Sequence, residues 1–124
     1  MSIRKTVGLV VLAAGLAASS ATQPPAVTRR TPQFENESVR VWKSTIAPGQ
    51  PLSLHRHESG RVIVALAGGT LEIVKESGES RAVTWETGKA YWLPADPPGE
   101  RHGDRNPGPQ PIEVMVVELV PQSR

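Results

Sequence analysis

The chain has 124 residues, 38% of them hydrophobic, and it contains no cysteine, which excludes a disulfide-stapled scaffold. Its 14 basic and 12 acidic residues nearly balance, and Arg4 and Lys5 at the N-terminus account for the excess of positive charge. The other charges give no clustered basic face, so no nucleic-acid partner is expected.

The first predicted element is an export signal over residues 1–21. A positive start precedes a twelve-residue apolar run, Val7 to Ala18, and small residues follow as far as Ala21. The run is short for a membrane span, which needs about 20 apolar residues, although an uncleaved anchor is an alternative. We expect cleavage after Ala21, a periplasmic or secreted domain, and no stable membrane span after cleavage.

Residues 22–37 follow as a Pro- and Thr-rich arm, and short β-prone runs separated by Gly and Pro turns begin at Ser38. The predicted strands cover residues 39–46, 52–57, 61–67, 70–75, 81–87, 91–93 and 112–120. No segment after the signal has ten residues with helical spacing. The sequence therefore predicts one all-β domain over residues 38–121, a sandwich, jelly roll or barrel of seven or eight strands.

The run at 61–67 is apolar on both of its faces. Strand alternation sends Arg61, Ile63 and Ala65 to one face of the strand. It sends the other three apolar residues, Val62, Val64 and Leu66, to the opposite face. We therefore expect burial on both sides or contact with a partner subunit, which makes a homodimer one expectation.

All three histidines of the chain lie in this β-rich part, as His55-x-His57 and as His102. Histidine is the commonest metal ligand among side chains. Residues i and i+2 of a strand face the same side about 7 Å apart, so His55 and His57 can converge on one ion while Arg56 points away. An isolated H-x-H pair is more often two solvated histidines, so the downstream spacing is what favours one shared site.

Glycines, a proline and an asparagine flank these histidines at regular spacing. The first group is Gly49, His55, His57 and Gly68. The second group is Gly88, Pro94, Gly99, His102 and Asn106. Together they resemble the two motifs of the cupin superfamily over about sixty residues, except that residues 95–98 fill a gap where one residue is usual.

The resemblance implies a small jelly-roll barrel of the double-stranded β-helix type with a metal site inside its mouth. It implies that His55, His57 and His102 bind a divalent transition metal. Imidazole ligands suit Fe, Zn, Mn, Ni or Cu, and the sequence does not choose among them.

One position departs from the cupin pattern, because Arg61 stands where a glutamate ligand is usual. A guanidinium only donates hydrogen bonds and cannot ligate a cation. In one interpretation, the three histidines retain a metal with open positions, as in cupin-like thiol and diketone dioxygenases, and Arg61 holds a substrate carboxylate. Alternatively, Glu58 turns in as an auxiliary ligand, or the metal site is weakened or lost and leaves a pocket for an anionic ligand.

Arg61 also has a simpler interpretation, as a solvated partner of Glu58. Tyr91 and Trp92 precede the second motif and are predicted to border the ligand cavity, with ordinary packing as the alternative. Two main functions follow. The first is a metal-dependent protein that acts on or binds a small carboxylate or oxygen-rich compound, with dioxygenase-, isomerase- or lyase-like chemistry if it is an enzyme. The second is a non-catalytic binding or sensing module. A structural domain that forms dimers is the third.

Overall fold

Nine strands form the fold in the computed structural model, which describes residue 8 and residues 10–15 and 24–123. They are β1 (Arg29–Glu35), β2 (Val39–Ile46), β3 (Leu52–His55), β4 (Arg61–Ala67), β5 (Gly69–Lys75), β6 (Ser80–Trp85), β7 (Ala90–Leu93), β8 (His102–Arg105) and β9 (Ile112–Leu119). No helix occurs among the described residues, so none of them forms a helix long and apolar enough to cross a membrane. The predicted export signal lies largely outside the described residues.

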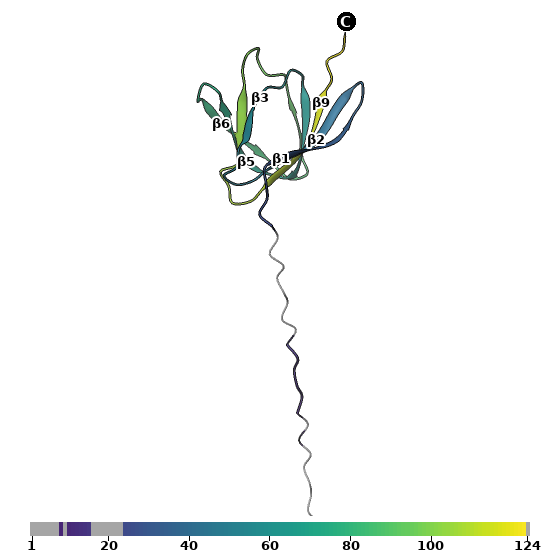
Figure 1. The fold of residues 1–124 in the computed structure, drawn as a ribbon, viewed down its shortest axis with the longest axis vertical. Coiled ribbons are helices and arrows are strands. Elements are labelled where there is room, and N and C mark those ends of the chain that lie inside the picture. The colour runs from purple at the N-terminus through teal and green to yellow at the C-terminus, as the bar shows by residue number, and fades with distance from the viewer. Residues whose placement is uncertain (1–7, 9, 16–23, 124) are drawn as a thin grey trace, which may run out of the picture.

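The strands form two antiparallel sheets. The larger has the order β1-β2-β9-β4-β7 and the smaller the order β3-β8-β5-β6, on opposite sides of the domain (Figure 1). This arrangement confirms the prediction of a single all-β domain.

The hydrophobic core fills the space between the two sheets. The larger sheet contributes inward-facing residues of β2, β4 and β9, and the smaller sheet contributes Leu71, Ile73 and Trp85. Alternation in β4 follows the prediction, since Arg61, Ile63 and Ala65 are buried while Leu66 is exposed. A pattern of period two thus places Arg61 on the same inner face as the core.

The larger sheet begins earlier in the chain than the sequence predicted. Residues 29–35, assigned to the arm, pair with β2 as an edge strand, and the register shifts between Pro32 and Phe34. Proline lacks a donor for the sheet ladder and is tolerated at an edge, which is why this polar stretch did not resemble a strand.

The other differences lie around the histidines. The strand predicted over residues 52–57 ends at His55, so His57 lies in the loop that follows. β8 was not predicted, because its four residues, His-Gly-Asp-Arg, show no apolar alternation. β8 forms a strand because it pairs with β3 on one side and β5 on the other, segments that are distant in the sequence.

Two motif residues outside the site, Gly68 and Asn106, fix the backbone around it. A Cβ at Gly68 would lie 2.1 Å from the Trp85 carbonyl oxygen, so only glycine fits between β4 and β5. Asn106 is buried, and its amide donates to the carbonyls of Ile46 and Gln110 while its carbonyl accepts from the Gly108 amide. Asn106 therefore fixes the chain just after β8, which carries His102.

Candidate metal centre

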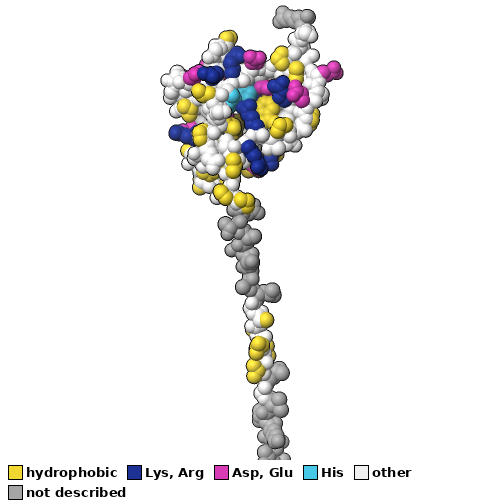
Figure 2. All heavy atoms as spheres, viewed as in Figure 1, with side chains coloured by type: hydrophobic (Ala, Val, Ile, Leu, Met, Phe, Trp, Pro, Cys, Tyr) yellow, Lys and Arg dark blue, Asp and Glu magenta, His cyan; other side chains and the backbone are white. Residues whose placement is uncertain are grey.

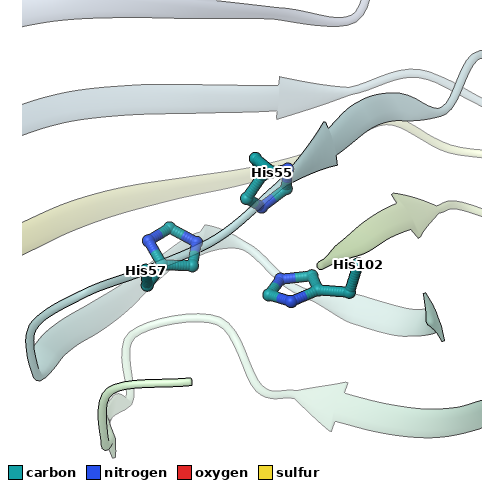
Figure 3. Close-up of side chains that lie close together, drawn as sticks. All are labelled: His55, His57 and His102. Carbon is teal, nitrogen blue, oxygen red and sulfur yellow. The ribbon is translucent and has the colours of Figure 1, made fainter. Parts of the chain in front are cut away.

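Three imidazoles from two distant segments meet in the space between the sheets. The ring centroids of His55 and His102 lie 4.5 Å apart, those of His55 and His57 lie 4.9 Å apart, and those of His57 and His102 lie 5.6 Å apart (Figure 3). One nitrogen from each ring lies within 4.8 Å of the others. The prediction that His102 joins the first pair is therefore confirmed, and the three residues can hold one ion.

His55 is placed by the register of two strands, since it lies directly opposite His102 in the β3–β8 pair. Its Nδ1 lies 2.7 Å from the carbonyl oxygen of Ser53, which can only accept, so Nδ1 carries the proton. Nε2 then presents a lone pair, and this atom is buried with no hydrogen-bond partner. An orphaned imidazole nitrogen facing two other histidines fits a metal ligand.

His57 is held by two carboxylates. Its Nδ1 donates to Glu118 Oε1 at 2.7 Å, which leaves Nε2 free, and its ring stacks on Trp42 with an interplanar angle of 2°. Its backbone amide donates to Asp96 Oδ2 at 2.7 Å, and the Asp96 amide donates back to the His57 carbonyl at 2.8 Å. A carboxylate that accepts from the ring, as Glu118 does, orients a metal-binding histidine and fixes its tautomer, and Asp96 holds the backbone of His57 in place.

Asp96 belongs to residues 95–98, the four residues that lengthen the second motif. The same Asp96 Oδ2 lies 3.4 Å from Nδ1 of His102. The longer loop therefore supplies an acid that contacts residues of both motifs. Sequence reasoning identified the extra residues but gave them no role.

The electrostatics keep the imidazoles of His55 and His102 neutral, as metal binding requires. Burial lowers the pKa of His55 to about 4. It also lowers the pKa of His102, and it raises the pKa of the Asp104 carboxyl, which lies beside them. Near neutral pH both histidines present lone pairs instead of positive charges.

Arg61 lies inside the barrel and is not a solvated partner of Glu58. Only 5% of the residue is exposed, and its guanidinium donates to the Pro94 carbonyl. Burial lowers its pKa, and the nearby carboxylates of Asp96 and Glu118 act in the opposite direction. Glu58 pairs with Arg56 instead, with 77% of its side chain exposed, so it does not turn toward the histidines.

The two aromatic residues predicted to border the cavity lie elsewhere. Trp92 pairs with Val62, is 58% exposed and covers Gly60, so its ring lies on the outer face of the sheet. Tyr91 faces inward and packs against the core, where its hydroxyl accepts from the Glu86 amide. Neither residue lines the two cavities that reach the histidines.

Those two cavities adjoin. The inner one, of about 30 Å³, is lined by the three histidines and has room for an ion or a single water. The outer one, of about 260 Å³, shares Arg61, Ile73, Leu93 and His102 with it. A small ligand in the outer cavity would therefore contact Arg61 and His102 at the entrance to the histidine site.

A second guanidinium, Arg30 of β1, also lines the inner cavity. It lies 5.3 Å from the centroid of the Trp42 ring, the same ring that stacks on His57. Figure 2 shows histidine atoms at the surface of this face with basic side chains beside them. Sequence reasoning missed Arg30 because residues 29–35 were taken for an arm.

No family model and no curated protein sequence matches this chain. Its fold, however, is similar to that of a cupin domain from Bordetella pertussis Tohama I, with a TM-score of 0.67 and 25% identity over 81% of this chain and 100% of that one. This protein has the cupin fold. The cupin motifs of the sequence and the positions of the three histidines agree with that assignment.

Two other solved structures extend the likeness. An RmlC-like cupin family protein with a double-stranded β-helix fold from Methanocaldococcus jannaschii has a TM-score of 0.58 and 15% identity over 75% of this cupin and 80% of its own chain. An uncharacterized conserved protein with a double-stranded β-helix domain from Klebsiella pneumoniae has a TM-score of 0.58 and 22% identity over 79% and 81%. At these identities the likeness shows the fold alone.

Proposed function

We propose that this cupin binds a divalent transition metal through His55, His57 and His102 and uses it to hold a small carboxylate or oxygen-rich compound. The observation that carries the proposal is the buried Nε2 of His55, which has a lone pair and no partner. Leaving such an atom unpaired costs about 1–3 kcal/mol. A cation shared with the other two imidazoles would remove that cost.

The compound is proposed to be anionic because two guanidiniums line the histidine cavity. Arg61 donates only to a carbonyl, and Arg30 lies over a Trp42 ring; within residues 24–123, the ion pairs formed by arginine involve other residues. A buried guanidinium without a carboxylate partner is well suited to bidentate recognition of a carboxylate. The outer cavity of about 260 Å³ limits the compound to a small molecule.

The metal, when bound, would polarise an oxygen of the compound as a Lewis acid, which is the chemistry of isomerase- and lyase-like enzymes, whereas dioxygenase-like chemistry would require a redox-active metal such as Fe. Arg61 would fix the anionic group at the entrance to the site. The carboxylates of Glu118 and Asp96 would keep the rings of His57 and His102 in place. Imidazole ligands suit Fe, Zn, Mn, Ni and Cu.

A metal-free binding or sensing module is the second candidate, and the guanidinium at position 61 favours it. The two functions differ in the effect of a chelator on ligand binding: a chelator would weaken binding that depends on the metal and would leave binding by a metal-free module unchanged. Elemental analysis of the purified protein, before and after reloading with Zn²⁺, is expected to give close to one equivalent of metal per chain. Less than a tenth of an equivalent after reloading would contradict metal binding.

Carboxylate binding tests the role of Arg61 separately. Calorimetry with small mono- and dicarboxylates, with and without a chelator, is expected to show binding that Arg61→Gln weakens at least tenfold. Arg56→Gln is the matched control, because Arg56 pairs with the exposed Glu58 and does not line either cavity. Binding that is unchanged by Arg61→Gln would contradict the anionic-ligand proposal.

We further propose that the domain is exported to the periplasm or secreted, on the basis of residues 1–21. Cell fractionation together with the mass of the mature protein tests this, and a cytoplasmic product that starts at Met1 would contradict it.

A homodimer through the outer face of the larger sheet is proposed on the basis of exposed Leu66 and Trp92. Light scattering at high protein concentration tests the dimer.

A further inference from the structure

Arg61 stands where the cupin pattern has a glutamate ligand, and another carboxylate of the barrel lies near the three histidines. We propose that Asp104 is a fourth metal ligand, so that the site consists of three histidines and a carboxylate supplied by β8 instead of β4. This inference rests on the proposed function, because it assumes that the histidines hold a metal.

Strand geometry places Asp104 beside the histidines. It follows His102 by two residues in β8, so both side chains lie on the same face of that strand. β8 runs between β3 and β5, with His55 opposite His102 and with Leu52 and Ile73 opposite Asp104. The Asp104 side chain accordingly lines the inner cavity together with all three histidines.

The orphaned nitrogen of His55 lies close to the Asp104 carboxylate. Asp104 Oδ2 lies 3.6 Å from His55 Nε2. Because Nδ1 of His55 carries the proton, Nε2 and an ionised carboxylate oxygen are both acceptors and no hydrogen bond joins them. One ion with bonds of about 2.0–2.2 Å to each atom can bridge this separation, since twice that length exceeds it.

The other carboxylates near the site are already engaged. Glu118 accepts from His57 Nδ1, and Asp96 accepts from the His57 amide. Glu58 lies in solvent with Arg56. Among the described residues, no hydrogen bond to the Asp104 carboxylate is formed, although only 14% of its side chain is exposed. A largely enclosed carboxylate without a hydrogen bond, facing an imidazole nitrogen with a free lone pair, is an arrangement that suits a cation between the two atoms.

A proton shared between Asp104 and His55 is the competing explanation, and metal titration separates the two. The full-length protein is titrated with Zn²⁺ in competition with a chromophoric chelator, and the Co²⁺-loaded protein is examined by visible absorption. Asp104→Asn is expected to weaken Zn²⁺ binding by roughly tenfold to a hundredfold or more and to change the Co²⁺ spectrum. Asp104→Glu, which keeps a carboxylate, is expected to recover part of the affinity, and Glu58→Gln should match the wild type.

Metal-free stability distinguishes a ligand from a structural residue. Because a largely enclosed carboxylate without a hydrogen bond destabilises the empty site, metal-free Asp104→Asn should melt at or above the wild-type temperature. Its gain in Tm on adding Zn²⁺ should be smaller. A residue that merely supports the fold would lower the metal-free Tm instead.

The outcomes that overturn the inference are distinct from those that overturn the proposed function. Wild-type protein that binds no Zn²⁺ would remove both. Wild-type protein that binds Zn²⁺ with the same affinity and the same Co²⁺ spectrum as Asp104→Asn would remove only the role of Asp104 and would favour the shared proton.

Discussion

The two segments that carry the histidines differ from the cupin pattern in opposite ways. The first, from Gly49 to Gly68, has the buried Arg61 in place of an acid and leaves Glu58 in solvent. The second, from Gly88 to Asn106, has gained acids at the site, with Asp96 in its longer loop and Asp104 beyond His102. Acid near the histidines thus comes from the second segment and from β9, while the first contributes a cation.

This difference divides two tasks between the segments: binding an anion at position 61, and supplying negative charge to a metal. A cationic position 61 can bind an anionic compound, provided that the negative charge a metal needs comes from elsewhere. Three carboxylates, one beside each imidazole, supply that charge: Asp104 at His55, Glu118 at His57 and Asp96 at His102. Variants in each segment test whether the two segments depend on each other in this way.

The largest effect is expected from removing a histidine of either segment. Because one ion is shared, His55→Ala and His102→Ala should each weaken Zn²⁺ binding by roughly a hundredfold or more. Competition titration measures this, with circular dichroism as a check on the fold. If one variant lost the metal and the other kept full affinity, the two segments would not share a site.

Removing the loop acid should have the next largest effect. Asp96→Ala takes away the acceptor of the His57 amide and the carboxylate beside His102. Loss of such an outer partner typically costs 10–100-fold in metal affinity. Glu58→Ala, an acid next to His57 in sequence, is the control and should change the titration little. Equal behaviour of the two variants would show that the longer loop has no part in the site.

Returning the usual acid to the first segment should act in the opposite direction. Arg61→Glu is expected to raise Zn²⁺ affinity by about tenfold, the effect of adding one carboxylate near the ion, and to abolish carboxylate binding. Without metal, the added negative charge beside Asp96, Glu118 and Asp104 should lower the Tm. Differential scanning calorimetry with and without Zn²⁺ measures both effects, and a rise in metal-free Tm would contradict this account.

The smallest effect is the pH dependence of the metal-free protein. The pKa of His55 is about 4 in the folded state and about 6.5 in an unfolded chain. Between these values the unfolded chain binds more protons, so the free energy of unfolding should fall as the pH is lowered through this window. His102 adds to the fall, because burial lowers its pKa, and Asp104 opposes it, because burial raises its pKa.

Chemical denaturation between pH 7.5 and 4 measures that slope. His55→Gln should have a shallower slope than the wild type over the same range, because it removes one of the titrating groups. A parallel pair of curves would mean that His55 is not buried in its neutral form.

Much of the fold and the centre of the site could be predicted from the sequence. Apolar alternation identified β2, β4 and β9, because these strands bury one face in the core. The motif spacing identified the three histidines, because glycines and Asn106 fix the turns that bring the segments together. These signals are local, or they have regular spacing along the chain.

The remaining features depend on tertiary pairing. β1 and β8 are polar and short of apolar alternation, so nothing local marks them as strands. Glu118 lies 61 residues from the imidazole that it orients. One signal was present, since Asp104 follows His102 at the same i, i+2 spacing that relates His55 and His57. The prediction for Trp92 was wrong because the face of the sheet on which it lies depends on the β4–β7 register. That register pairs Trp92 with Val62 and so places it on the opposite face from Arg61.

β1 has a practical consequence for anyone who shortens this chain. A fragment that begins at Ser38, the predicted domain boundary, would lack β1 and leave the amides and carbonyls along one side of β2 unpaired. Open strand edges of this kind promote aggregation between molecules. The same cut would remove Arg30 from above Trp42, so the shortened protein would lose one of the two guanidiniums on which the proposed anion binding rests, even with its histidines intact.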